Sequence, residues 1–524
     1  MDHNRLEDIS LASPFQRYLG TNYIPTDAEI NQIHGNILPD CEVELARLNS
    51  LIQDLKAQRD KIQNYLASHK ALISQARRLP QDILGEIFLA CLPTGGNAMM
   101  SAREAPLLLG HICSNWRSIS LAQPRLWASL HITVEFCGSS EGQSAVVDWL
   151  RRSEPLPVAI SVHSHGSNQY IAAIDILIPL ASRLNALRLS NIPWKQFLAL
   201  ASVNAPLLTD IHIDFGGDIL LDEGARILAS NIFLGTNMKH IAIISANPRS
   251  LIPNTDFAWG HITDLCIECN LGYSLQHLGL DSMHSPMQGC SRLKFLRIQV
   301  HLAAAALSVG APLLLSSLQG LTIITHGPRF NTLLEYLNND LRMPQLTKLH
   351  LIDLDPTGTR AITFDRLADH SPLITDFCLN VLSFESTAFI IRDLRPFTSL
   401  EQLSVVVWAP KYAPKNKLCL KPDILELFRT LTSPIDGKLP FPSLRELSVE
   451  MGDIAEGEWM SFLQYHVNHS TPFRRLHLHM WRKPNAGPVD KNRKDRLAKF
   501  LAAGLDVSVD YTICPHEEES SEDD

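Results

Sequence analysis

The chain has 524 residues, of which 45% are hydrophobic and 19% are charged. Glycine (26) and proline (31) occur at ordinary levels, which excludes collagen-like and broadly disordered chains. The formal net charge is −9, but six carboxylates lie in the last eight residues, so the body of the chain is close to neutral and shows no sign of a nucleic-acid surface. At about 100–200 residues per domain, the length allows two to four domains with real cores.

The N-terminal residues and the cysteines predict the compartment. No basic start is followed by an apolar run, so we expect no signal peptide. The ten cysteines are scattered singly, unlike the disulfide framework of a small secreted domain. The longest uncharged stretch, residues 302–325, is interrupted by glycine and proline and fits helix, turn and strand better than a membrane span. We therefore expect a cytoplasmic or nuclear protein with no membrane partner.

Residues 1–37 lack a sustained apolar period and are expected to form a loose leader. Residues 38–76 are expected to form one long helix, because apolar positions recur at a spacing of three and four with no glycine or proline between Cys41 and Leu79. The stripe consists of Leu38, Cys41, Leu45, Leu48, Ile52, Leu55, Arg59, Ile62, Leu66, His69 and Ile73. This heptad pattern is typical of a coiled-coil seam. Two alternatives remain open: the helix packs back on its own protein, or it forms a homodimer through residues 38–73.

Residues 77–130 contain three short apolar segments. Their apolar residues surround each predicted helix rather than lining a single stripe, as in residues 83–92. A unit of about 50 residues can barely bury its own apolar surface. We therefore expect something else to cover the remainder, either a second protein or the downstream part of the chain.

This segment resembles an F-box. The resemblance rests on Leu79-Pro80, Ile83-Leu84, Ile87-Phe88, Cys113-x-x-Trp116-Arg117, Ile119-Ser120 and Pro124-x-Leu126-Trp127. Residues 93–105 depart from the usual pattern as a longer and more glycine-rich insert. A heptad helix that leads straight into such a motif is similar to the arrangement in many F-box proteins of fungi.

Residues 131–510 are expected to form an array of irregular leucine-rich repeats. The chain contains 79 leucines, and the pattern φ-x-x-φ-x-φ, where φ is a large apolar residue, occurs eleven times at intervals of 24 to 31 residues, with one interval of 44. The units begin at Leu184, Leu208, Met238, Ile262, Leu293, Leu318, Leu346, Ile374, Leu400, Leu444 and Phe473. Two earlier strands are expected at residues 130–134 and 157–162.

The predicted fold is therefore of the α/β class: a long helix, a small helical unit, and a repeat solenoid with a parallel sheet on its concave face. Many repeats open with a phrase such as Ala205-Pro206-Leu207, in which proline is expected to end the preceding helix and start the strand. Residues 511–524 are expected to form a disordered acidic tail.

In each predicted strand the φ positions face the core, and the residues between them face the concave side. Exposed aromatic residues beside mixed charge suit a protein-binding surface. The candidates for contact with a target protein are Arg297, His350, Trp408, Glu450, His477 and Trp481.

Enzyme signatures are absent from the sequence. It has no P-loop, His-Glu-x-x-His or Gly-x-Ser-x-Gly motif and no paired cysteines at zinc spacing. Cys266 and Cys269 are three apart on a predicted strand, so they face opposite sides. His477 and His479 share a face, but no third ligand is evident near them in the sequence, so we expect a satisfied or solvated pair. No catalytic residue, cofactor or metal is therefore expected.

The F-box resemblance implies a substrate receptor of a Skp–cullin–F-box ubiquitin ligase. By that resemblance, one set of residues lies in or beneath the surface that docks the Skp adaptor and, through it, a cullin: Leu79, Pro80, Ile83, Leu84, Ile87, Phe88 and Trp116. The repeats would hold a target protein. Two alternatives remain: an F-box and repeat scaffold with no role in ubiquitination, or a plain repeat scaffold whose helical unit only caps the solenoid.

Overall fold

The computed structural model describes residues 13–164, 170–216, 230–233, 235–245, 259–269, 287–301, 312–326, 330–353, 364–380, 387–406, 424–434, 438–452, 456–482 and 493–513. These residues belong to two compact units, Met1–Glu86 and Ile87–Asp524. No helix in the described part of the chain combines the length and the apolar character that a membrane crossing requires.

The first unit is helical. Its elements are η1 (Gln16–Tyr18), α1 (Asp27–Gln32), η2 (Ile33–Ile37), α2 (Leu38–Leu72), η3 (Gln75–Arg78) and the first part of α3 (Gln81–Ala90). The segment expected to be a loose leader is thus helical from Asp27. The reason is a capping box, in which Thr26 and Glu29 satisfy each other's backbone N–H groups at the start of α1.

Helix α2 has 35 residues and a length of about 52 Å at 1.5 Å per residue. Pro39 lies in its first turn, where a missing N–H group is tolerated. None of its residues is buried, and the stripe residues Ile52 and Ile62 are among the exposed side chains. Helicity across this segment therefore comes from local propensity and ion pairs such as Glu44–Arg47 rather than from burial within the unit.

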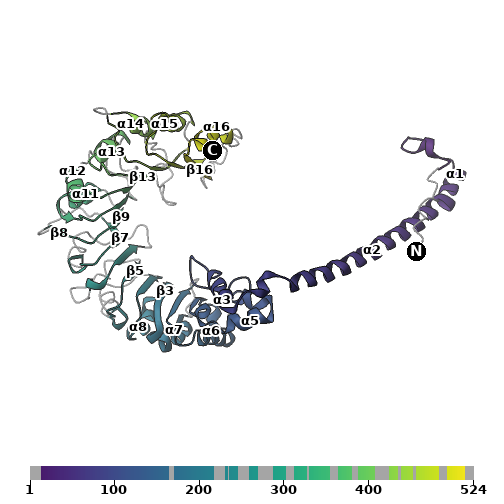
Figure 1. Ribbon diagram of the computed structural model, residues 1–524, viewed down its shortest axis with the longest axis horizontal. Coiled ribbons are helices and arrows are strands. Elements are labelled where there is room, and N and C mark those ends of the chain that lie inside the picture. Colours follow the sequence, from purple (N-terminus) through teal and green to yellow (C-terminus); the bar gives the residue numbers. More distant parts are fainter. Residues whose placement is uncertain are drawn as a thin grey trace, which may run out of the picture. The chain divides into compact units, whose positions relative to one another are not determined.

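The second unit is a solenoid built on one parallel sheet of 14 strands, with its strands on the inner side of a curve and its helices on the outer side (Figure 1). The strand order is β1-β2-β3-β4-β5-β6-β7-β9-β11-β12-β13-β14-β15-β16, so each strand pairs with the next one along the sheet. Two short strands, β8 (Leu313–Leu314) and β10 (Leu341–Arg342), form a second parallel pair. The predicted α/β leucine-rich-repeat solenoid is confirmed.

The strands of the large sheet are β1 (Ser129–Thr133), β2 (Val158–His163), β3 (Leu184–Ile192), β4 (Asp210–Phe215), β5 (His240–Ser245), β6 (Asp264–Cys269), β7 (Phe295–His301), β9 (Gly320–His326), β11 (Lys348–Asp353), β12 (Asp376–Asn380), β13 (Gln402–Val406), β14 (Glu446–Gly452), β15 (Arg475–Arg482) and β16 (Asp506–Ile513).

The helices of the second unit, beyond the end of α3, are α4 (Leu107–Ile112), α5 (Ser114–Leu121), η4 (Pro124–Trp127), η5 (Phe136–Gly138), α6 (Ser140–Arg152), α7 (Tyr170–Leu177), η6 (Ile178–Arg183), α8 (Trp194–Ala201), η7 (Asn231–Phe233), η9 (Trp259–His261), α11 (Phe330–Asn339), α12 (Asp365–His370), α13 (Thr387–Leu394), α14 (Ile424–Thr432), α15 (Glu456–Asn468) and α16 (Arg493–Ala502). Helix α14 belongs to the long interval between the ninth and tenth repeats.

The core lies between the sheet and the outer helices. Along many strands burial alternates, as in β4, where Ile211, Ile213 and Phe215 are buried and the residues between them are half-exposed. Between β12 and the neighbouring helices, Phe364, Phe377 and Phe397 pack with ring centroids 5.6–6.0 Å apart. Each fully buried side chain of this size contributes about 1.5–3 kcal/mol to the free energy of unfolding.

A tight turn precedes most strands. Leu208, Leu346 and Leu400 each donate a backbone hydrogen bond to the carbonyl three residues earlier. The proline of the repeat phrase sits inside such a turn, and the strand begins several residues later, as at Pro206 before β4. The prediction that proline starts the strand is therefore wrong. Proline lies in the turn before the strand, because its fixed φ suits the second position of a β-turn.

One strand, β16, is absent from the sequence-based set. It extends to Ile513, past residue 511 where the acidic tail was expected to begin. Residues 514–524 lie outside the described residues. The position equivalent to the first φ of a repeat is occupied by Gly504, which has a φ of +85°, and the apolar residue has moved to Leu505. This shift removes the φ-x-x-φ-x-φ spacing while preserving the strand.

The insert at residues 93–105 covers the first edge of the sheet. Met99 forms an isolated parallel bridge with His131 of β1, and the carbonyl of Ala98 accepts a hydrogen bond from the His131 backbone N–H. Asn97 donates to the Ser161 hydroxyl at 3.1 Å, and Ala98 is fully buried. The feature that departs from the F-box pattern therefore protects an edge that would otherwise expose unpaired backbone groups.

A buried histidine lies behind the last repeats. His466 of α15 is 6% exposed, and its ring stacks on Phe473 with centroids 4.5 Å apart. Its Nδ1 lies 2.6 Å from the Thr471 hydroxyl. Burial, with a smaller contribution from His469, lowers the pKa of His466 from 6.5 to about 4.

This pKa predicts acid lability. The unfolded chain takes up the proton near pH 6.5 and the folded chain only near pH 4, so stability falls as the pH drops through that window. We expect a loss of about 2 kcal/mol between pH 7 and pH 5 from this group alone. His466→Phe should remove that part of the pH dependence in urea unfolding, whereas His469→Gln, at the exposed position just after α15, should keep most of it, because burial is the main cause of the shift. Equal pH dependence in both variants would contradict the assignment.

Candidate functional site

The residues singled out by the F-box resemblance divide into two groups by exposure. Leu79, Ile83 and Ile87 are 37%, 47% and 40% exposed, and Pro80 is also exposed. Leu84 and Phe88 are buried. Ile83 and Ile87 are one turn apart in α3, so they occupy the same side of that helix.

Phe88 and Trp116 form the base of this region. The Phe88 side chain is fully buried, and its ring centroid lies 4.8 Å from that of the half-buried Trp116. The Arg117 guanidinium donates to the Gly110 carbonyl at 2.8 Å, which ties α5 to α4. These contacts hold the short helices in fixed positions, although α4 and α5 have only six and eight residues.

Helices α4 and α5 also leave apolar side chains uncovered. Leu108 and Ile112, one turn apart in α4, are 41% and 54% exposed, and Leu121 at the end of α5 is 45% exposed. Together with Ile87 they give the short helices of the second unit four exposed large aliphatic residues. Solvent-facing helices of this length normally carry polar residues at such positions.

The same helical segment also caps the solenoid. The buried Trp127 of η4 packs edge-on against Trp149 of α6 with ring centroids 4.8 Å apart, and Arg152 lies over the Trp127 ring. The indole N–H of Trp127 donates to the Ser120 carbonyl at 2.8 Å. Capping accounts for the buried residues of the segment but leaves its exposed aliphatic residues unexplained.

The concave face of the sheet is arranged in rows, because the parallel register places equivalent residues side by side. One row runs through Asp210, His240, Asp264, Phe295, Gly320, Lys348, Asp376, Gln402, Glu446, Arg475 and Asp506. The next row includes His131, Ser161, Arg188, His212, Cys266, Arg297, Thr322 and His350. Both rows lie on the face that the sequence predicts to be concave.

A hollow of about 1080 Å³ lies on this face. Its floor is formed by the two rows between β1 and β11, and residues 94–97 with Met99 form one end of it. At one point of the floor only glycine fits. A Cβ atom on Gly320 would lie 2.7 Å from the Phe295 ring. The hollow is large enough to accept several side chains of a bound polypeptide.

The hollow contains both signs of charge. His240 bridges two strands, contacting Asp210 and, through Nε2, Asp264 at 3.1 Å. Arg297 pairs with Glu268, and Lys348 lies 3.5 Å from Asp376. Arg188 forms no ion pair with any other residue in the described part of the chain.

Burial affects the titration of several groups in these rows. It lowers the pKa of His131, an effect to which the nearby His163 and Arg188 add. Burial and Arg188 also lower the pKa of His212, against the opposing effect of Asp214 and Glu268. Burial and the neighbouring Glu268 raise the pKa of Cys266 to about 12. At neutral pH the imidazoles of His131 and His212 are therefore neutral and the Cys266 thiol is protonated.

The candidates for target contact have different places in the structure. Arg297 and His350 lie in the hollow. Glu450 and His477 lie on β14 and β15 beyond it, and Trp481 is in β15 beside Gly452 and Thr512, with its side chain outside what the structure describes. Trp408 lies outside the described residues. Three further residues of the hollow, Arg188, His131 and His240, were not predicted as contact residues, although all three occupy outward positions of strands.

Cys266 and Cys269 lie on opposite faces of β6, the first half-exposed and the second buried, as their spacing predicts. Asp510 of β16 lies close to His477 and His479 and was missed because β16 itself was not predicted. Only the strand register brings these residues together.

No protein-family model and no curated protein matches the chain in sequence. Among solved structures, it is similar to the one described as the crystal structure of Rad7 and Elc1 complex in yeast, with 12% sequence identity and a TM-score of 0.34. The match covers 87% of this chain and 96% of that chain. The function of this chain is therefore inferred from its own residues.

Proposed function

We propose that the chain is an F-box substrate receptor that docks on the Skp adaptor of a cullin ubiquitin ligase and holds a target protein on its repeats. The observation that carries the proposal is the set of exposed aliphatic residues on short helices whose buried residues already cap the solenoid. A surplus of apolar surface at that place is the mark of a protein-binding site. The resemblance of residues 77–130 to an F-box favours the Skp adaptor as the partner.

The proposed docking residues are the exposed Leu79, Pro80, Ile83 and Ile87, the buried Leu84 and Phe88, and the half-buried Trp116. Leu108 and Ile112 extend the apolar area on α4. Burial of each aliphatic side chain against an adaptor would contribute about 1.5–3 kcal/mol before the costs of association. A receptor of this kind forms and breaks no bonds; it raises the effective concentration of target lysines near the ubiquitin-carrying enzyme.

The adaptor surface is tested by pull-down with the Skp adaptor. Ile83→Lys combined with Ile87→Lys should reduce binding at least tenfold, because two charges would be buried in an apolar contact. Both residues are exposed, so the fold should survive, which thermal unfolding verifies. The matched control is Val147→Lys, at a 52% exposed position of α6, which should bind normally. Normal binding by the double variant, or no binding by the wild type, contradicts the proposal.

The target is proposed to bind in the hollow of the concave face. The mixed charges, the neutral His131 and His212 and the exposed Phe295 suit a polypeptide better than a uniformly charged ligand. Arg188 and Arg297 are the guanidinium groups that line the hollow. Arginine is among the residue types that dominate binding energy at protein interfaces.

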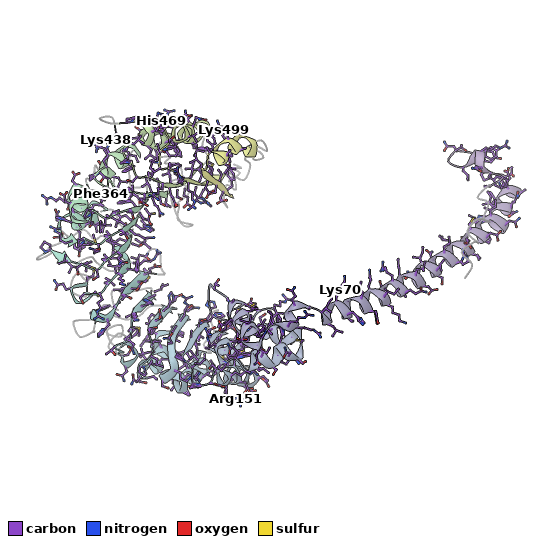
Figure 2. The ribbon with its side chains drawn as sticks, in the orientation of Figure 1. Lys70, Arg151, Phe364, Lys438, His469 and Lys499 are labelled. Atoms are coloured by element: carbon purple, nitrogen blue, oxygen red, sulfur yellow. The ribbon has the colours of Figure 1, made fainter. Side chains whose placement is uncertain are left out.

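The target is sought by proximity labelling in cells with and without proteasome inhibition. Wild type should label at least one protein that accumulates only when the proteasome is blocked. Arg188→Glu with Arg297→Glu should lose that protein, whereas Arg151→Glu on the outer helix α6 should retain it (Figure 2). The Ile83→Lys, Ile87→Lys variant should label it without any need for inhibition. If the adaptor binds but no labelled protein responds to inhibition, the chain is a scaffold with no role in ubiquitination.

We propose further that α2 pairs with a second copy of the chain through the seam of residues 38–73. The seam residues are unburied, and Leu51, Tyr65 and Leu72 widen the apolar strip along one side of it. Arg59 and His69 interrupt the seam and lower its stability without removing it. Two joined receptors would bind a multivalent target with added avidity.

The pairing is tested by sedimentation of the full chain, whose protomer mass is 58.5 kDa. Ile52→Glu with Leu55→Glu should convert a dimer into a monomer. Val43→Glu, at a 71% exposed position off the seam, should leave the dimer intact, and Arg59→Ile should tighten it. A wild-type chain that is monomeric at micromolar concentration refutes the pairing.

A further inference from the structure

Two histidines and an aspartate meet on the concave side of the last two strands. His477 and His479 are two residues apart in β15, so their side chains lie on the same face of the sheet. The parallel register places Ser508 opposite His477 and Asp510 opposite His479. One ligand atom from each of His477, His479 and Asp510 lies within 4.8 Å of the other two, and Nε2 of His477 is 3.8 Å from Oδ2 of Asp510.

We propose that these three side chains bind a divalent transition-metal ion of the zinc type. Bonds of 2.0–2.2 Å at a tetrahedral centre place neighbouring ligand atoms about 3.4 Å apart. The 3.8 Å separation of His477 Nε2 and Asp510 Oδ2 already approaches that value. Asp510 is 63% and His477 39% exposed, so small side-chain rotations can close the remaining distance without disturbing the core.

A neighbouring hydroxyl orients one of the ligands. Nδ1 of His477 lies 2.6 Å from the Ser508 Oγ. When Nδ1–H donates to that hydroxyl, Nε2 is left as the acceptor on the side of Asp510. Metal-bound histidines generally use their second ring nitrogen in this way, which fixes the tautomer and the ring plane. Ser508 is therefore a positioning residue in this proposal.

The donor set also limits the choice of ion. Two imidazoles and one carboxylate suit zinc, copper, nickel or iron, whereas magnesium and calcium prefer all-oxygen sites. Glu450 of β14 stands opposite His479 in register and adds negative charge on that side. Three protein ligands leave a fourth position on the concave side for water or for a group of a bound molecule.

The full chain, freed of metal by a chelator, is titrated with Zn²⁺ by calorimetry. Because the chain has 21 histidines, the decisive quantity is one molar equivalent of tight binding. His479→Ala and Asp510→Asn should each lose that equivalent, and His469→Ala on the helix side should keep it (Figure 2). Ser508→Ala should weaken binding about 10–100-fold. Mg²⁺ should not compete.

Two outcomes overturn the proposal. The first is an unchanged stoichiometry and affinity in His479→Ala and Asp510→Asn, and the second is equal competition by Mg²⁺. If His479→Ala fails to fold, Asp510→Asn still tests the proposal. Asp510 is exposed, and asparagine has nearly the same size as aspartate, so this variant should fold. With Co²⁺ as the probe, the visible absorption of a tetrahedral site should appear in wild type and disappear in Asp510→Asn.

Discussion

The constraint on which the solenoid depends is the in-register parallel pairing of its 14 strands. Apart from one local register shift in each of the β2–β3 and β3–β4 pairs, the pairing places each φ residue beside the φ residues of the neighbouring strands, so the core is continuous from β1 to β16. A shift of one residue would turn every core side chain of that strand toward solvent. The same pairing assembles the concave face, because residues distant in sequence become neighbours about 4.8 Å apart. Both the hollow and the histidine–aspartate cluster follow from this register.

The first strand of the sheet must also be covered at its free edge. The short helical segment before β1 does this with its buried residues, while its exposed residues take no part in the capping. The insert around Ala98 pairs with β1, and Trp127 packs against Trp149, so the first repeat is covered. These contacts use the buried side of the short helices. Ile87, Leu108 and Ile112 take no part in capping and remain exposed. Capping alone therefore does not explain why these positions are aliphatic, and this is the basis of the proposed docking surface.

The sequence predicted the features that depend on local periodicity and missed those that depend on register. Eleven repeats and two earlier strands were identified because their apolar residues recur at fixed spacing. Strand β16 was missed because Gly504 occupies the first apolar position, and with it Asp510 was missed as a neighbour of His479. The early start of α1 followed from the pair Thr26 and Glu29, a signal that was present but not used. The pairing of Met99 with His131 had no local signal at all.

Three histidines in the last repeats differ in their surroundings according to the side of the sheet on which they lie. His466 points into an aromatic core, where burial keeps its ring neutral to well below neutral pH. His477 and His479 alternate with the buried Leu476, Leu478 and Met480, so they face the concave side. There they meet a carboxylate and a hydroxyl from β16 instead of phenylalanine rings. Moving β15 by a single residue would bury both histidines and dismantle the cluster, so a metal ligand set at this place can exist only while the repeat register holds.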